Sequence, residues 1–243
     1  MSNIRLDSLL AKRGLAESRE RAKAVIMSGN VFIGGSRAEK PGMQVSESID
    51  IEIREKMEYV SRGGQKLEKA LAFFGVSPEG RICIDCGAST GGFTDCLLSR
   101  GAAKVYAVDS GTDQLSEKLR YNTRVISLEG VNARALDLTL LGERCDIAVM
   151  DVSFISQTKL YGALISALKP GGKFVSLVKP QFEAGRKNIG KGGIVRDEAA
   201  RLEALETVIT EAGKFGLRCL GTMVSPITGG DGNVEYLAYF YLE

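Results

Sequence analysis

The chain has 243 residues, of which 44% are hydrophobic and 26% charged, and these values are ordinary for a globular protein. No apolar run is long enough to span a bilayer, and the first residues, MSNIRLDSLLAKRG, contain no apolar signal-peptide core. We therefore expect a cytoplasmic protein without a membrane partner, built as one sizeable α/β domain plus a small appendage.

The absence of histidine limits the chemistry that the chain can perform. Any general base must be Asp, Glu, Lys, Tyr or Cys, so Ser-His-Asp and Cys-His mechanisms are excluded. Cys83 and Cys86 form a lone C-x-x-C with neither a second cysteine pair nor a histidine to complete a zinc site. The five cysteines are odd in number, so we expect no disulfide framework, no metal, and small apolar side chains in a buried strand.

The net charge is only +2, but it is unevenly spread. Residues 1–40 hold eight Lys or Arg and four acidic side chains, a local balance of +4. A small basic end on a near-neutral body predicts an anionic partner. From charge alone, a solvated charged face is an equally good interpretation.

The N-terminal segment predicts a compact pair of helices followed by short strands. RLDSLLAKRG places its leucines on one helical face, with Gly14 as the stop, and Ser18 is expected to cap a second helix that ends near Gly29. VFI and SIDIEI then indicate strands. The arrangement RLDSLLAKRGLAESRERAKAVIMSGNVFIGG resembles the RNA-binding domain named after the small-subunit ribosomal protein "S-four", over roughly residues 4–53. The resemblance implies structured RNA as the anionic partner. The candidate RNA-binding residues here are Arg5, Lys12, Arg13, Arg19, Arg21 and Lys23.

From residue 81, short apolar runs alternate with helical stretches. The expected strands are Arg81–Asp85, Lys104–Asp109, Arg124–Leu128, Cys145–Met150, Lys173–Val178, Leu217–Met223 and Glu235–Tyr241. Helical patterns separate the first six, which is the rhythm of a mostly parallel, doubly wound sheet. We therefore expect an RNA-binding domain at 1–55, a linker at 56–62 and an α/β domain at 63–243.

The glycine-rich turn DCGASTGGFTD ends the first of these strands, where an open α/β sheet binds its ligand. It has neither the Gly-Lys-Ser/Thr of a phosphate-binding loop nor the G-x-G-x-x-G of dinucleotide folds. Asp109 closes the second strand, where an acid holds ribose hydroxyls, so a ligand with a ribose is expected. The turn alone would also suit a structural bend in another α/β protein.

Turn and acid together resemble motif I of the S-adenosylmethionine methyltransferases, with VYAVD as the ribose-binding strand. The resemblance implies S-adenosylmethionine as cofactor, with Asn132 near the adenine. The candidate cofactor-binding residues are Asp85, Gly87, Ala88, Ser89, Thr90, Gly91, Gly92, Asp109 and Asn132.

Two lysines and two acids are expected at the same edge of the sheet. Asp151 and Lys179 follow the fourth and fifth strands, whose carboxyl ends share that edge. Glu235 begins the last strand and lies there if that strand runs antiparallel, and Lys66 precedes the first strand on a helix. Singly, each is more often a surface charge. Together beside a methyl donor they suit a ribose hydroxyl, because a lysine can take its proton or stabilise the oxyanion while carboxylates orient the group.

The order Lys66, Asp151, Lys179, Glu235 matches the K-D-K-E tetrad of FtsJ-like RNA ribose 2′-O-methyltransferases. The words DVSFIS, LVKPQFEAG, KGGIVRDEAAR and SPITGGDGNVEYL resemble the TlyA family, which joins an S-four domain to an FtsJ-like domain over nearly this whole length. After Asp109, however, SGTDQL differs from the VGYGQL of relatives.

The resemblance implies a Rossmann-like seven-strand domain that methylates cytidine 2′-hydroxyls of ribosomal RNA. Large-subunit RNA is the family-wide target, and some members also modify small-subunit RNA. We expect a monomer that acts on ribosomal RNA or ribosomal subunits. Lys179 would activate the hydroxyl, Asp151 and Glu235 would orient it, and Lys66 would complete the site. Phe154 is expected either near the substrate or in the core. Further candidate RNA-binding residues are Arg62, Arg186, Lys187, Lys191 and Arg196.

Three alternatives remain open at this stage. A base methylase is the first. An exocyclic-amine methylase usually has an Asn/Asp-Pro-Pro-aromatic motif after the fourth strand, where this chain has DVSF. A carbon-five cytosine methylase needs a nucleophilic cysteine at the site, whereas Cys145 lies at the start of the fourth strand and not at its end. A membrane-active haemolysin, a label that the family also carries, needs a membrane-spanning or amphipathic element. A ribosome-binding factor without catalysis would retain the fold but not need the lysine–acid set.

Overall fold

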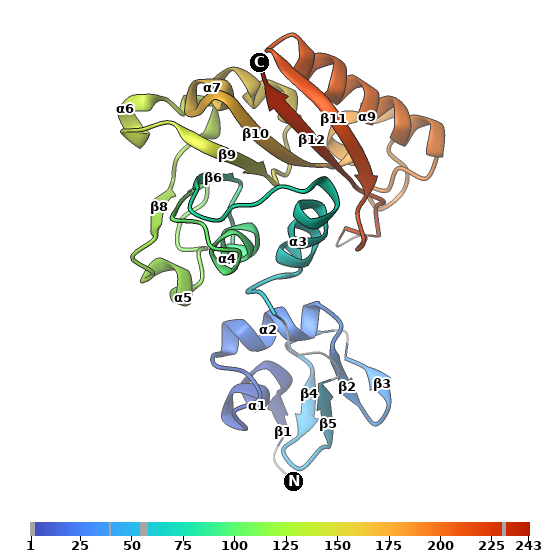
Figure 1. Ribbon diagram of the computed structural model, residues 1–243. Helices are drawn as coiled ribbons and strands as arrows, with labels where there is room; N and C mark the ends of the chain where they lie inside the picture. The colour runs from blue at the N-terminus through green and yellow to red at the C-terminus, as the bar shows by residue number, and fades with distance from the viewer. Residues whose placement is uncertain (1–2, 39, 54–57, 230–231) are drawn as a thin grey trace. The chain divides into compact units, whose positions relative to one another are not determined.

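The computed structural model describes residues 3–38, 40–53, 58–229 and 232–243. The chain divides into two compact units, Met1–Arg62 and Gly63–Glu243 (Figure 1). Of the expected linker at 56–62, residues 56 and 57 lie outside the described residues.

The N-terminal unit contains two helices and two small antiparallel sheets. The helices are α1 (Leu6–Lys12) and α2 (Arg19–Met27), and the strands are β1 (Asn3–Arg5), β2 (Val31–Ile33), β3 (Ser36–Arg37), β4 (Gln44–Ser46) and β5 (Ile51–Ile53). Strand β1 pairs with β4, and β2 lies between β3 and β5. The leucines of α1 pack on the apolar face of α2 in one buried core. The cap expected at Ser18 is present, since its side chain accepts a hydrogen bond from Arg21 N at 3.1 Å.

A buried carboxylate organises the start of this unit. Asp7 has no exposed surface. It accepts hydrogen bonds from Arg5 Nε (3.1 Å) and Nη2 (2.8 Å), and Arg19 Nε lies 3.3 Å from its Oδ2. The hydrogen bond from Arg5 holds the pKa of the Asp7 carboxyl well below its usual value. Asp7 thereby links β1, α1 and α2 through charge-assisted bonds.

The larger unit is built on a seven-stranded sheet in the order β11-β12-β10-β9-β6-β7-β8. Its strands are β6 (Ile82–Cys86), β7 (Lys104–Asp109), β8 (Val125–Glu129), β9 (Cys145–Met150), β10 (Leu168–Val178), β11 (Leu217–Val224) and β12 (Tyr236–Leu242). Strands β10, β9, β6, β7 and β8 pair in parallel. The last strand, β12, runs antiparallel between β10 and β11, as the placement of Glu235 required. This is the expected Rossmann-like α/β fold.

Strand β10 departs most from the expected strand boundaries. It begins at Leu168, five residues before the expected start at Lys173. Its pairing with β9 shifts register between these two residues, where the sequence reads LKPGGK. Proline and glycine are weak strand formers that mark irregular pairing, so the sequence pattern predicts a strand that starts only after them.

Helices cover both faces of the sheet (Figure 1). The helices are α3 (Arg62–Phe74), α4 (Gly92–Ser99), α5 (Glu117–Arg120), α6 (Leu138–Leu141), α7 (Tyr161–Ala167), α8 (Pro180–Glu183) and α9 (Glu198–Gly213). On the face under α7 and α9, Tyr161, Phe174 and Phe240 are fully buried. On the opposite face, Phe74 of α3 packs against Tyr239, with ring centroids 5.4 Å apart.

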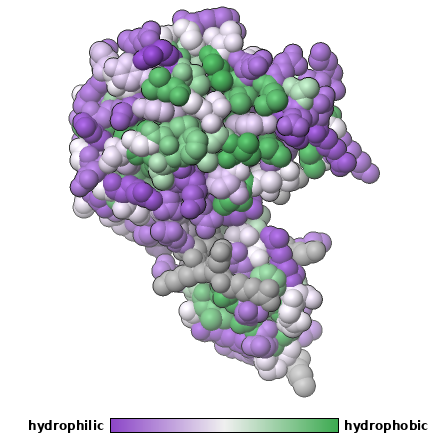
Figure 2. Space-filling model, turned by 45° about the vertical axis from the view of Figure 1, so that its right-hand side comes forward, coloured by the Kyte–Doolittle hydropathy of each residue, from purple (hydrophilic) through white to green (hydrophobic). Residues whose placement is uncertain are grey.

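The cysteines of the C-x-x-C pair are free and buried in β6, as expected. Within the described residues, no helix is long and apolar enough to cross a membrane. On the face of the larger unit in Figure 2, apolar side chains form patches separated by polar and charged ones.

We predict that Asp7→Ala destabilises the N-terminal unit by about 2 kcal/mol, because it removes charge-assisted hydrogen bonds to a buried acceptor. Hydrogen exchange at the α1 and α2 amides measures this locally. Because the pKa of Asp7 is depressed by folding, its stabilisation is complete above the ordinary Asp pKa of about 4 and is lost as the pH falls below it. The variant should lack that acid dependence. Asp50→Ala, an exposed carboxylate in the same unit, is the control; equal exchange in both variants would contradict the prediction.

Candidate active site

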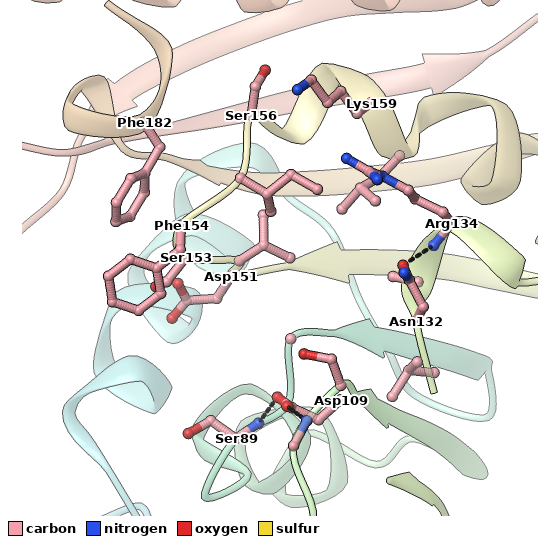
Figure 3. A pocket seen from close by; sticks show the side chains of 18 of the residues that line it. Ser89, Asp109, Asn132, Arg134, Asp151, Ser153, Phe154, Ser156, Lys159 and Phe182 are labelled. Atoms are coloured by element: carbon pink, nitrogen blue, oxygen red, sulfur yellow. Dashed lines mark hydrogen bonds between the residues drawn. The ribbon is translucent and has the colours of Figure 1, made fainter. Parts of the chain in front are cut away.

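A cavity of about 950 Å³ opens at the carboxyl ends of the parallel strands. It is bounded by the turn after β6, the end of β7, the segment 151–156 after β9, and α8 (Figure 3). In Figure 3, Ser89 and Asp109 lie at the bottom, Asn132 and Arg134 to the right, and Phe154 and Phe182 to the left.

The glycine-rich turn forms one wall of the cavity. The amides of Gly87 and Ala88 donate to Val108 O at 2.9 and 3.0 Å, which ties the turn to β7. Gly87 has φ +84°, and a Cβ at this position would lie 2.5 Å from the carbonyl oxygen of Asp151. Gly91 has φ +94°, and a Cβ there would lie 2.2 Å from Leu119. Glycine at 91 is therefore required by packing against α5, whereas glycine at 87 is required where the turn meets the end of β9.

Asp109 is held rigidly at the bottom of the cavity. Its Oδ2 accepts from Ser89 N at 2.8 Å and its Oδ1 from Gly111 N at 2.7 Å. Each carboxylate oxygen can accept a second hydrogen bond, so the group can still receive ligand hydroxyls. Asn132 lines the same cavity and uses Oδ1 to accept from Arg134 N at 3.0 Å, which leaves its amide donors for a ligand.

The remaining candidate cofactor residues lie away from the cavity surface. Asp85 is completely buried, accepts from Thr94 Oγ1 at 2.7 Å, and burial raises the pKa of its carboxyl to about 7. This hydrogen bond joins β6 to α4, the two elements that flank the turn. Of the nine residues, the cavity lining includes Gly87, Ser89, Asp109 and Asn132.

The two lysines and two acids meet at this edge as two ion pairs. Lys179 Nζ lies 2.6 Å from Oδ1 of Asp151 and donates to Ser153 Oγ at 2.9 Å. Lys66 Nζ, from α3, lies 2.5 Å from Oε2 of Glu235. Lys66 and Glu235 are only 8% and 3% exposed. Val178 pairs with Tyr236 in the β10–β12 ladder, which sets Lys179 and Glu235 at the same sheet edge.

Two aromatic residues complete the cavity. Phe154 has φ +64°, a conformation that is uncommon for a bulky side chain, and is 93% exposed, so it does not belong to the core. Its ring lies 5.4 Å from that of Phe182 in α8 (Figure 3). Phe182 is not among the residues predicted from the sequence, although its place in LVKPQFEAG, three residues after Lys179, was an available signal. Arg134 and Lys159 also line the cavity and were not predicted as site residues.

Most of the candidate RNA-binding cations of the N-terminal unit make contacts inside it. Arg5 and Arg19 hold Asp7, Arg13 donates to the carbonyl oxygens of Glu47 (2.5 Å) and Ile49 (2.7 Å), and Arg21 donates to Tyr59 O at 3.0 Å. Lys12 pairs with Glu47. Lys23 makes no ion pair with any residue that the structure describes.

In the larger unit, the exposed candidates are Arg186, Lys187, Lys191 and Arg196. Arg186 lines the cavity, and Arg62 begins α3. Asn233 anchors this loop near Glu235. It accepts from Val195 N and donates to Gly193 O, both at 3.0 Å.

Comparison with known proteins places this geometry in a family. The family described as FtsJ-like methyltransferase matches residues 59–241, and the S4 domain matches residues 4–50. The 16S/23S rRNA (cytidine-2′-O)-methyltransferase TlyA of Mycobacterium tuberculosis is 43% identical over 97% of this chain and 88% of its own length. Hemolysin A of Brachyspira hyodysenteriae is 43% identical over 98% of this chain and all of its own length.

A solved structure described as "Putative hemolysin from Streptococcus thermophilus" is 48% identical and superposes with a TM-score of 0.79, covering all of this chain and 89% of that one. The expected S-four and FtsJ-like resemblances are thus both confirmed. The chain belongs to the FtsJ-like methyltransferase family and carries an S4 domain before the methyltransferase domain.

Proposed function

We propose that this protein transfers a methyl group from S-adenosylmethionine to the ribose 2′-hydroxyl of a cytidine in ribosomal RNA. The observation that carries the proposal is the pair of lysine–carboxylate contacts, Lys179–Asp151 and Lys66–Glu235, at the sheet edge where the cavity opens, and Asp151 is the member of the set that lines the cavity. The name of the M. tuberculosis relative, 43% identical over nearly the whole chain, supports the cytidine ribose as the target.

The cavity fits the cofactor chemically. Asp109 offers fixed acceptors for ribose hydroxyls, Asn132 offers amide donors, and Gly87 lets the backbone approach closely. These residues, with Ser89, would hold S-adenosylmethionine, which supplies an electrophilic methyl group. The deviation SGTDQL after Asp109 leaves these contacts intact, because Gly111 within it donates to Asp109.

The residues at the sheet edge would then act on the incoming hydroxyl. An ammonium has three donors. One of those of Lys179 is used by Ser153 Oγ, and the Asp151 carboxylate lies 2.6 Å from Nζ, so the ammonium keeps donor capacity for the 2′ oxygen. Lys179 would stabilise the negative charge that develops on that oxygen, and Asp151 would orient the ammonium. Lys66 and Glu235, which are buried and neutralise each other as an ion pair, would complete the site.

Phe154 and Phe182 would receive the base of the target nucleotide. An exposed aromatic ring beside a second one gives a stacking surface, and a nucleotide base of any identity can stack on it through its π-face. The S4 unit, proposed to span 1–55, would bind the RNA and the domain at 63–243 would modify it. We propose that the protein works as a cytoplasmic monomer on ribosomal subunits.

The test is to incubate the protein with labelled S-adenosylmethionine and ribosomal subunits from cells that lack it, and then to map the label. Label in a cytidine whose 3′ bond resists alkali is expected, because 2′-O-methylation blocks cleavage. Label on a base would overturn the site assignment. Absence of label despite tight RNA binding would favour a ribosome-binding factor without catalysis.

We predict that Lys179→Met lowers kcat by at least about 100-fold, since it removes the donor to the developing oxyanion. Single-turnover methylation measures the effect. Lys169→Met is the matched control, because Lys169 pairs with Asp146 at 2.7 Å across the same two strands at the opposite edge of the sheet. The control should retain near-normal kcat. An RNA affinity that falls as much as kcat in Lys179→Met would contradict the assigned role.

We also predict that Gly87→Ala weakens S-adenosylmethionine binding at least about tenfold, or 1.4 kcal/mol, as titration calorimetry would show. The new Cβ would overlap the Asp151 carbonyl oxygen at 2.5 Å and displace the turn. Gly80→Ala is the control, since Gly80 also has a positive φ (+65°) but no atom within 4 Å of the added Cβ. Gly80→Ala should bind S-adenosylmethionine normally, and equally tight binding by Gly87→Ala would contradict the prediction.

A further inference from the structure

The segments that follow β9 and β10 are also joined by Glu183, which lies farther along the chain than the Lys179–Asp151 pair. Glu183, at the end of α8, accepts a hydrogen bond from Ser156 Oγ at 2.6 Å with Oε2. With Oε1 it accepts from Gln157 N at 2.9 Å. One carboxylate of the β10 side thus holds two consecutive residues of the β9 side.

The segment that Glu183 holds is the one that presents Phe154. Phe154 has a positive φ and a side chain that is 93% exposed, so its own packing cannot fix its conformation. Strained conformations of this kind persist only where neighbouring contacts determine them. The bonds to Glu183 lie two and three residues after Phe154. Glu183 itself directly follows Phe182, the aromatic partner, so one side chain fixes the spacing of both rings.

The segment is also anchored from beneath. The side chain of Gln157 is buried and accepts a hydrogen bond from Ser176 of β10. Residue 157 is therefore bound through its backbone by Glu183 and through its side chain by the sheet. Since Ser176 and Glu183 both belong to the β10 side, the segment after β9 is fastened to that side at two points.

The contact suits a carboxylate. Both partners of Glu183 donate to it, a hydroxyl and a backbone amide, and each glutamate oxygen accepts one bond. Glutamine at this position could still accept from the Gln157 amide and could donate to Ser156 Oγ, because a hydroxyl can also accept, so it would keep part of the contact. Alanine would satisfy neither, and the Gln157 amide would lose its acceptor.

We propose that Glu183 is a positioning residue of the methyl-transfer reaction. It clamps the segment 153–157 so that Phe154 faces Phe182 and Ser153 stays within reach of Lys179. It makes neither of these contacts itself and acts through the segment that does. The proposal rests on the proposed function only for its kinetic consequence, and the clamp itself is testable without catalysis.

The clamp is tested with a fluorescent reporter. The chain contains no tryptophan, so Phe154→Trp introduces a single probe at the presented position. In this background, adding Glu183→Ala is expected to lower the steady-state anisotropy of the probe and shift its emission, because the segment becomes mobile. Glu183→Gln should fall between the two. The matched control is Glu143→Ala, which removes a carboxylate that accepts from Lys104 (2.6 Å) and Tyr106 (3.0 Å) before β9, at the other sheet edge.

The consequence is tested by kinetics on the chain with Phe154 intact. Glu183→Ala is expected to lower kcat on the order of 10- to 100-fold through misplacement of the substrate. KM for RNA and the affinity for S-adenosylmethionine should stay within about twofold, because neither the S4 unit nor Asp109 is touched. Glu183→Gln should recover part of the loss. If anisotropy and kcat both match the controls, the proposal fails; it also fails if Glu143→Ala lowers kcat equally. If the wild-type chain transfers no methyl group, the proposed function fails, while the anisotropy result still decides whether the clamp exists.

Discussion

The antiparallel pairing of β12 with β10 is the constraint on which the site depends. Parallel strands carry their carboxyl ends to one edge, and this alone brings Asp151 beside Lys179. A seventh parallel strand would have carried Glu235 to the opposite edge. Because β12 is antiparallel to β10 and Tyr236 pairs with Val178, Glu235, directly before β12, lies at the same sheet edge as Lys179, directly after β10. Lys66 then reaches this edge from α3, on the face where Phe74 packs against Tyr239.

The two ion pairs at this edge are better explained by the reaction than by stability. The Lys66–Glu235 pair is almost fully buried, and burial of two charges costs desolvation that their attraction barely offsets. An apolar pair of similar size would serve a core equally well. In the Lys179–Asp151 pair, the acid lines the cavity. The two lysine side chains are similarly buried, 10% exposed for Lys66 and 13% for Lys179, so the pairs differ chiefly in their acids, of which Asp151 is 25% exposed and Glu235 3%.

Sequence patterns predicted the fold and the edge of the sheet at which the charged residues lie better than they predicted the contacts between those residues. The boundaries of β7 and β9 were predicted correctly because each has an apolar run that stops at an acid, Asp109 as the last residue of β7 and Asp151 directly after β9. The start of β10 was missed because Pro170 and Gly171 interrupt the pattern. Topology predicted that the lysines and acids would share an edge, but not which lysine pairs with which acid, since pairing depends on side-chain direction. The contacts of Glu183 could not be predicted from the sequence, because a glutamate in a short polar segment is most often an exposed surface charge.

The N-terminal cations show why a count of charges is a weak guide to their state. Five of the six candidates there are tied to acceptors inside the unit, which removes side-chain freedom without removing charge. Arg5 and Arg19 keep nearly half of their side-chain surface exposed while they hold Asp7. A guanidinium has five donors, so a phosphate can be bound without loss of the internal contact. In the proposed RNA-binding role, the ordering of these groups in advance would lower the entropic cost of binding, and the buried carboxylate of Asp7 would contribute by holding Arg5 and Arg19 in place.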